Sequence, residues 1–343
     1  MNRKVLRARW LLILACAVMT CFCFMKLNQS YDPLARYQYA TDKNRNVILK
    51  YLDEDDIDYM ISQQIKPEEY MDFIKIDGFD IHYTKYYETA KETRDADNEY
   101  IVNFVNRYQT NFTRDSLEKL LTNYTYQELT SFYEEEVSKQ NNLHLIDDPT
   151  DMYTILDAEH SVYHYAPSDL TTVGSIQLRS EAASHLEKME ADYKKIFSKD
   201  LDVVSGYQSY ETLANAYPSE QEAYGDLIDE IVLPPGQNEA QLGFTIELSG
   251  AQNWYELCVQ NNNGGIVDYT AVEEQLTDEQ KEEMIWLEEN AYRYGFIIRY
   301  PSGTESDTNM LYQPFILRYV GIDEAKTMHS SHDCMETADL ENE

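Results

Sequence analysis

The chain has 343 residues, of which 28 are Lys or Arg and 62 are Asp or Glu, so its formal net charge is −34 at pH 7. Five of the basic residues and none of the acidic ones lie within residues 1–26, which leaves the rest of the chain with 23 basic against 62 acidic residues. A surface of that sign repels phosphate, so a nucleic-acid partner is excluded. The length suggests about two domains.

The N-terminus predicts a membrane anchor. Residues 1–9 carry four basic side chains, residues 10–25 carry no charge, and Lys26 ends the apolar run. We therefore predict that residues 1–27 form a cytoplasmic tip and a signal anchor, which crosses the membrane through residues 5–27. The basic flank belongs on the cytoplasmic side, so the C-terminal domain is expected outside the cell. No A-x-A-like cleavage site follows the run, which favours an uncleaved anchor; ILAC at 13–16 is a faint lipoprotein-like alternative.

Residues 31–147 predict a helical leader region. Apolar side chains recur at helical spacing in 57–65, 98–108 and 115–137, and Pro67 is suited to the first turn of a further helix. No residues in this region have catalytic spacing, so we expect packed structural helices.

After residue 147 short β-rich runs alternate with helices. The pattern predicts one long amphipathic helix, over 176–197, and a second helix opened by the capping box of Thr277 and Gln280. Pro314 lies within the last strand pattern and predicts an edge strand or a bulge. The predicted strands are 201–207, 243–248, 296–301 and 310–321. We predict an α+β domain over 148–325, with a small antiparallel sheet packed with helices, and an acidic flexible tail over 326–343.

Five ordered blocks of this region carry a family resemblance. They are PSDL (167–170), SGYQSY (205–210), PPGQNEAQLGFTIE (234–247), WLEENAYRYGFIIRYP (286–301) and LYQPFILRYVG (311–321). With these blocks the chain resembles the VanY-type D-alanyl-D-alanine carboxypeptidases, which are zinc enzymes that trim the stem peptides of the bacterial cell wall. The leader also looks like that of Gram-positive members. The resemblance implies the same fold for residues 148–325.

The residues that carry the family's chemistry differ in this chain. The resemblance assigns the zinc-ligand positions to Ala240, Glu247 and Ile316, the general base to Gln313, and a substrate-binding arginine to Gln208. A catalytic zinc needs about three protein ligands, and the side chains of Ala and Ile have no lone pair to donate. A glutamine cannot accept a proton at neutral pH. We therefore expect no catalytic residue, no metal site and no cofactor, the family's zinc having been lost.

The resemblance also implies a substrate groove, formed by residues that surround these changes. They are Ser205, Tyr207, Tyr210, Arg299, Tyr312 and Arg318. The predicted function is a membrane-anchored, extracellular and non-catalytic family member, whose partner is peptidoglycan stem peptide or a cell-envelope protein. One alternative is a working zinc D,D-carboxypeptidase with relocated ligands. Another is a scaffold protein in which the leader carries the binding.

The sequence contains other candidate metal ligands and one candidate disulfide. His329, His332 and Cys334 have ligand-like spacing, although a mobile polar tail is the favoured interpretation. His160 and His164 are four residues apart, but their β-rich surroundings argue against a shared helix face. Cys258 and Cys334 could pair in an oxidising compartment, and the sequence leaves this open.

Overall fold

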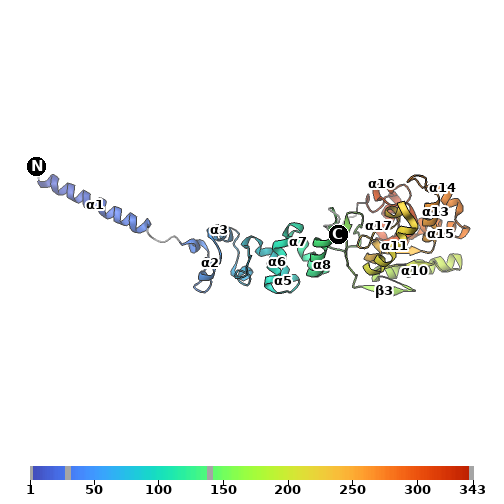
Figure 1. The fold of residues 1–343 in the computed structure, drawn as a ribbon, viewed down its shortest axis with the longest axis horizontal. Helices are drawn as coiled ribbons and strands as arrows, with labels where there is room; N and C mark the ends of the chain where they lie inside the picture. The colour runs from blue at the N-terminus through green and yellow to red at the C-terminus, as the bar shows by residue number, and fades with distance from the viewer. Residues whose placement is uncertain (1–2, 28–31, 137–141, 340–343) are drawn as a thin grey trace. The chain divides into compact units, whose positions relative to one another are not determined.

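The computed structural model describes residues 3–27, 32–136 and 142–339 (Figure 1). By contacts within the chain it divides into two compact units, residues 1–109 and residues 110–343. The sequence-predicted boundary between 147 and 148 therefore lies inside the second unit. Each unit is described by itself.

The first unit is helical. Its elements are α1 (Arg3–Leu27), η1 (Pro33–Arg36), α2 (Arg45–Tyr51), α3 (Glu54–Ser62), α4 (Pro67–Tyr70), η2 (Ile81–Tyr83), α5 (Thr84–Thr93) and α6 (Asn98–Tyr108). A capping box between Asp53 and Asp56 opens α3, and Pro67 occupies the first turn of α4 as predicted. Helix α6 has the predicted bounds, and its apolar face is buried because Ile101, Val102 and Val105 share that face.

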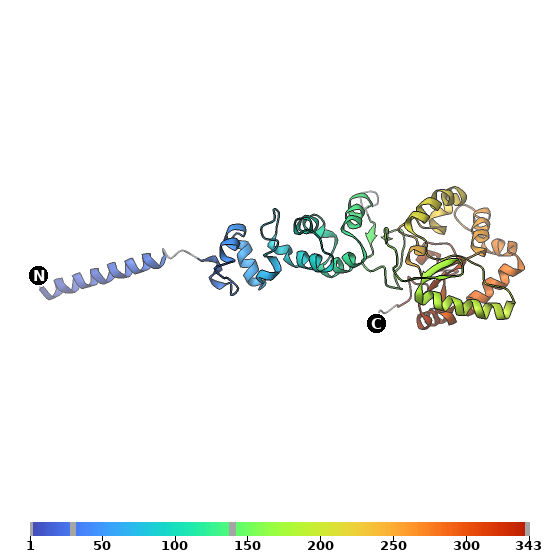
Figure 2. The same ribbon diagram turned by 90° about the horizontal axis from the view of Figure 1, so that it is seen from below.

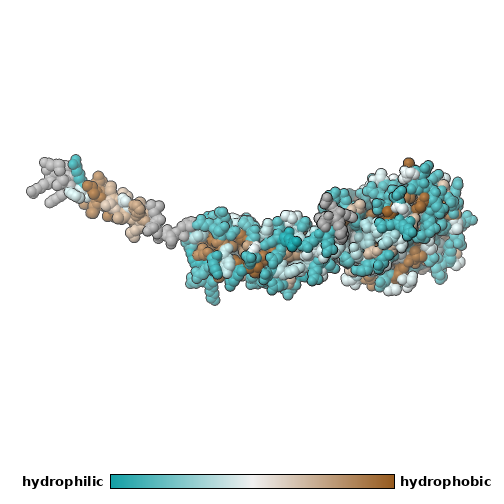
Figure 3. All heavy atoms as spheres, viewed as in Figure 1, coloured by the Kyte–Doolittle hydropathy of each residue, from teal (hydrophilic) through white to brown (hydrophobic). Residues whose placement is uncertain are grey.

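Within α1, Arg9–Lys26 is long and apolar enough to cross a membrane, and all of it is exposed to the surroundings. Figure 3 shows this helix mostly brown, the colour of hydrophobic residues. A signal sequence passes the same test of length and composition.

The second unit begins with short helices, α7 (Arg114–Asn123), α8 (Tyr126–Ser131) and the π-helical turn η4 (Phe132–Glu136). The sequence predicted helical structure over 115–137, and the described part of this range, up to residue 136, forms these short helices with a break between the first two. Tyr124 is extended, and Thr125 forms a capping box with Glu128 that opens a new helix. In an uninterrupted helix these backbone N–H groups would donate to carbonyls of the preceding turn. At the new helix start the cap accepts their hydrogen bonds instead.

The site is built around a four-stranded antiparallel sheet with the order β5-β6-β8-β7. Its strands are β5 (Val203–Ser205), β6 (Thr245–Leu248), β7 (Phe296–Tyr300) and β8 (Gln313–Tyr319). Every residue of β8 is buried, so the prediction that Pro314 marks an edge strand was wrong. Pro314 is tolerated because β6 pairs only with residues 316–318 of β8. The other predicted alternative, a bulge, agrees with the structure, because the pairing of β8 with β7 shifts register between Ile298 and Tyr300 of β7.

A hairpin of β3 (Leu170–Val173) and β4 (Ile176–Arg179) precedes the long helix α10 (Ser180–Phe197) and lies along it (Figure 2). The helix predicted from residue 176 therefore begins four residues later, because residues 176–179 pair with β3. Two further short strands, β1 (His144–Leu145) and β2 (His160–Ser161), pair in parallel.

The remaining helices surround the four-stranded sheet. They are α11 (Tyr210–Tyr224), η5 (Gly225–Leu227), α12 (Ile228–Ile231), η6 (Glu239–Leu242), α13 (Gly250–Gln260), α14 (Tyr269–Gln275), α15 (Asp278–Asn290), η7 (Ala291–Tyr294), α16 (Glu305–Thr308) and α17 (Ile322–Ser331). The predicted capping box of Thr277 and Gln280 opens α15. The mixed class and the small antiparallel sheet are confirmed.

The predicted flexible tail is wrong for residues 326–339. Helix α17 continues to Ser331, and Cys334 and Met335 behind it are 0% and 2% exposed. Met335 packs in one cluster with Val320 and Met328. Burial of these few apolar side chains stabilises the segment despite its polar composition.

Candidate functional site

A cavity of about 140 Å³ lies in the second unit, at the end of the central sheet. Its walls include Ser205 and Gln208, Ala240 and Glu247, Gln313 and Ile316. Six residues that the sequence analysis singled out from three separate blocks are thus brought together in one place.

Strand register explains how three of them meet. On the sheet Glu247 of β6 is paired with Ser205 of β5 on one side and with Ile316 of β8 on the other. Paired residues on neighbouring strands present their side chains to the same face. The three side chains therefore form one row across the sheet and line the cavity together.

A tight turn places Ala240 in the wall of the same cavity. The Asn238 side chain accepts a hydrogen bond from the backbone N–H of Ala240 at 2.9 Å and opens η6. Gly243 ends η6 with φ of +74°, where a Cβ atom would lie 3.1 Å from Cγ of Arg179. Glycine is favoured there because side chains rarely adopt this backbone conformation. This turn allows the chain to pass from η6 directly into β6.

The side-chain amides of Gln208 and Gln313, which line the cavity, form hydrogen bonds with neighbouring groups. The Gln313 Oε1 atom accepts a hydrogen bond from the Tyr255 hydroxyl at 2.9 Å, and its Nε2 atom donates to the Ile231 carbonyl at 3.1 Å. Gln208 Nε2 donates to Ser205 Oγ at 2.7 Å. These hydrogen bonds fix the orientation of each amide, and neither amide can act as a base.

The cavity does not fit a catalytic zinc ion. Of the three ligand positions that the resemblance assigned, Ala240, Glu247 and Ile316, only Glu247 carries an atom that binds metal, and about three protein ligands are needed. Among the described residues no group of three or more His, Cys, Asp or Glu side chains is placed to hold a metal.

The other ligand candidates are dispersed. The His329 ring stacks on Tyr292 with 3.9 Å between ring centroids, and the buried Cys334 Sγ lies 3.5 Å from the Thr337 hydroxyl. His160 lies in a strand, as its β-rich surroundings indicated, and contacts Asp157. Cys258 and Cys334 are both buried and both free thiols.

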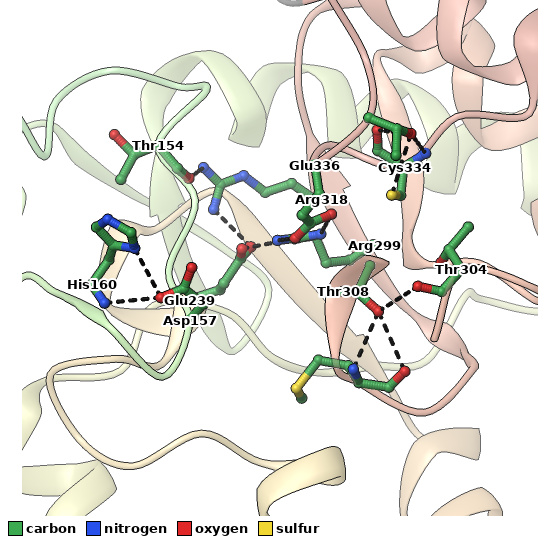
Figure 4. A network of polar contacts seen from close by, with 12 residues as sticks. Thr154, Asp157, His160, Glu239, Arg299, Thr304, Thr308, Arg318, Cys334 and Glu336 are labelled. Carbon is green, nitrogen blue, oxygen red and sulfur yellow. Dashed lines mark hydrogen bonds and ion pairs between the residues drawn. The ribbon is translucent and has the colours of Figure 1, made fainter. Parts of the chain in front are cut away.

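A buried ion network borders the cavity and fixes η6 to the sheet (Figure 4). One carboxylate oxygen of Glu239 accepts a hydrogen bond from Nε of Arg299 at 2.7 Å, and the other accepts one from Nη1 of Arg318 at 2.9 Å. Glu336, from the C-terminal segment, accepts two hydrogen bonds from the far side of Arg299, at 2.7 and 3.1 Å. Burial alone would raise the pKa of Glu239, but the two arginine charges outweigh it and hold that pKa below its ordinary value.

The network revises the role predicted for the two arginines. Both side chains of Arg299 and Arg318 are 0% exposed, and neither lines the cavity. Two positive and two negative charges compensate one another, which makes burial of the group tolerable. The arginines hold the fold and are not surface groups available to a ligand.

The predicted tyrosines also lie outside the cavity walls. The Tyr312 hydroxyl donates to Glu288 at 2.6 Å and its ring is 3% exposed, while Tyr210 stacks on His164 at 3.8 Å. Tyr207 is half-buried nearby, and its backbone N–H donates to the Gln177 carbonyl. Of the six predicted groove residues only Ser205 is a wall residue.

Two acidic residues without a counter-charge define the electrostatics of the cavity. Burial raises the pKa of Glu247 to about 7, and the charge of Glu220 adds to this shift. Burial also raises the pKa of Glu220 itself. Among the described wall residues none is Lys, Arg or His, so these carboxylates face no cation.

Several wall residues were missed from the sequence. Glu220 and Tyr224 come from α11, and Gln252 and Tyr255 come from α13. Neither helix carries a motif, so nothing in the sequence pointed to these residues. Glu239 directly precedes Ala240 and could have been considered with it.

The second unit contains the part of the chain that matches a known protein family. Residues 175–322 match the VanY family, D-alanyl-D-alanine carboxypeptidase. The chain is 31% identical over 215 residues to the Bacillus subtilis (strain 168) protein named "Putative carboxypeptidase YodJ", covering 59% of this chain and 72% of that one. The chain therefore belongs to the VanY family of D-alanyl-D-alanine carboxypeptidases.

The chain is also similar to other known proteins. The D-alanyl-D-alanine carboxypeptidase of Enterococcus faecium is 25% identical over 162 residues, which span 47% of this chain and 44% of that protein. Among solved structures, the LdcB LD-carboxypeptidase is similar with a TM-score of 0.42 and 30% identity, covering 57% of this chain and 88% of that chain.

Proposed function

We propose that this chain is a membrane-anchored member of its family that binds cell-wall peptide without hydrolysing it. One observation carries the proposal. One cavity is lined by Ala240, Glu247, Ile316 and Gln313, which are the residues that the resemblance assigned to the family's metal and base positions. A cavity remains, but it lacks both the ligands for zinc and a base to activate water.

The apolar replacements make this cavity compatible with a fold that holds no metal. Polar ligands left without their ion would be costly to bury. Ala240 and Ile316 avoid that cost, while Gln313 is satisfied by the Tyr255 hydroxyl and the Ile231 carbonyl. The domain can therefore be stable without zinc and still offer a concave site for part of a peptide.

The proposed location is the outer face of the cell membrane, with α1 as the anchor. Its apolar stretch is preceded by basic residues, which favour the cytoplasmic side. Cell fractionation should recover the full-length chain in the membrane, with the region after residue 32 cleaved by protease added outside intact cells. A shortened soluble form in the medium would show that α1 is a cleaved signal sequence.

Metal content and D-alanine release test the loss of hydrolysis. The full-length chain in detergent micelles should hold far less than one equivalent of zinc and release no D-alanine from a pentapeptide ending in D-Ala-D-Ala. A chelator should leave its melting temperature unchanged, because no metal-binding energy is coupled to folding. The E. faecium relative, treated identically, is the positive control. Stoichiometric zinc with chelator-sensitive release would instead establish a working enzyme with relocated ligands.

A further inference from the structure

The walls of the cavity combine two features that rarely occur together. Most of the lower wall is apolar, from residues Leu213, Ile231, Leu233, Met310 and Ile316. The Glu220 and Glu247 carboxylates also line the cavity, and among the described wall residues there is no side chain of positive charge. The remaining acidic wall residue, Glu239, is already neutralised by Arg299 and Arg318.

Glu247 is an unpartnered polar group that points into this cavity. It is half-buried and lines the cavity. Its carboxylate accepts no hydrogen bond and forms no ion pair with any residue that the structure describes. An acceptor buried in that way carries the desolvation cost of its charge, which a cationic donor placed in the cavity would offset.

We propose, on the basis of the peptide-binding function above, that the cavity recognises an alkylammonium group of the peptide, held between Glu220 and Glu247. The ammonium donates hydrogen bonds to the two carboxylates, and its aliphatic stem lies along the apolar wall. Tyr224 and Tyr255, whose ring centroids are 5.6 Å apart, add ring faces and edges beside the cation.

The same charges disfavour binding of the C-terminal carboxylate of a peptide that ends in D-Ala-D-Ala. A peptide's C-terminal carboxylate placed here would face Glu220 and Glu247 with no cation among the described walls. Gln208, at the position of the family's substrate-binding arginine, brings no charge to compensate. The volume of about 140 Å³ is also well below the roughly 300–1,000 Å³ of sites that enclose a whole small ligand. One side chain or one terminal residue fits that space, and the rest of the peptide lies outside.

Peptides that differ only in their amines test the assignment. Calorimetric titration of the full-length chain in micelles would compare L-Lys-D-Ala-D-Ala with its Nα-acetyl, Nε-acetyl and diacetyl forms. The free peptide should bind at least tenfold more tightly than the diacetyl form, which is the typical effect of one charged hydrogen bond. The singly acetylated peptide that retains affinity shows whether the side-chain or the N-terminal ammonium is bound. Amidation of the C-terminus should not weaken binding.

Variants assign the effect to the two carboxylates. Glu247→Gln and Glu220→Gln keep the shape of each side chain, and each should weaken binding of the free peptide at least tenfold while leaving the diacetyl form unaffected. Glu222→Gln is the matched control, because Glu222 lies on the same helix as Glu220 but is exposed and does not line the cavity. It should bind as the unaltered chain does.

The outcomes separate this inference from the proposed function. Equal affinity for the free and diacetyl peptides would overturn the ammonium assignment and leave peptide binding intact. Butylammonium is a further probe. If it binds in a manner that depends on Glu247, and no peptide binds, this result would support the ammonium site and overturn the peptide-binding function. Stoichiometric Ca²⁺ or Mg²⁺ that blocks the peptide would overturn the assignment in favour of a metal site. No binding of any probe at millimolar concentration would overturn both.

Discussion

Replacing Glu247 with glutamine should make the protein more stable at neutral and alkaline pH. Glutamine has nearly the same shape but carries no charge to be desolvated. Burial raises the pKa of Glu247 from its ordinary 4.5 to about 7 in the folded protein. The folded state therefore keeps its proton to a higher pH than the unfolded state, and stability falls as the pH rises from about 4.5 to about 7.

The size of the effect follows from that pKa. Each tenfold change in proton affinity corresponds to about 1.4 kcal/mol, so the charged carboxylate costs about 3 kcal/mol at full ionisation. The difference between Glu247→Gln and the unaltered chain should be near zero at pH 4.5, grow up to pH 7 and then level off. For a domain of 150–250 residues this corresponds to about 6–12 °C in melting temperature.

Thermal unfolding of the full-length chain in micelles, monitored at pH 4.5, 6 and 8, measures this difference. Other ionisable groups in the domain also titrate, so the variant must be compared with the unaltered chain at each pH. The groups that face Glu247 are Glu220 and Tyr224 of α11, Glu239 of η6, Tyr255 of α13 and Tyr300 of β7. Glu222→Gln should show no such difference. An unchanged gap between pH 4.5 and pH 8 would refute the argument that Glu247 is buried without a counter-charge.

Three further substitutions test the packing that builds the cavity, each by thermal unfolding. Glu239→Gln leaves two buried arginines without their shared carboxylate and should cost about 3–5 kcal/mol; a loss below 1 kcal/mol would mean that solvent reaches the network. Glu336→Gln removes a partly exposed partner of Arg299 and should cost less, up to about 3 kcal/mol, whereas no loss would show that the C-terminal segment is not held there. Gly250→Ala places a Cβ 2.7 Å from the Phe315 ring and should cost about 1–3 kcal/mol; an unaltered melting temperature would contradict this close approach.

Local sequence signals predicted the elements whose determinants are local. The bounds of α6, the opening of α15 at its capping box and the turn of α4 at Pro67 all follow from residues within a few positions of one another. The same signals failed where pairing partners decided. Residues 176–179 became a strand because β3 lies beside them, and Pro314 entered a central strand because β6 pairs only beyond it.

The family was also visible in the sequence, because motif spacing is a linear property. That Ser205, Glu247 and Ile316 stand in one row depends on strand register, which their wide separation in sequence does not reveal. Glu220 became a wall residue by the docking of a helix that carries no motif.

The arginines show most clearly what the tertiary structure alone decided. The sequence identified Arg299 and Arg318 as retained residues beside the altered site, and a substrate role was a reasonable prediction. Whether an arginine faces a ligand or the interior depends on where its counter-charges lie. Here the counter-charges are Glu239 in η6 and Glu336 near the C-terminus. The sequence thus identified candidate residues for the site, while long-range burial and charge pairing determined which of them a ligand can reach, because these two arginines leave water only where the fold supplies their carboxylate partners.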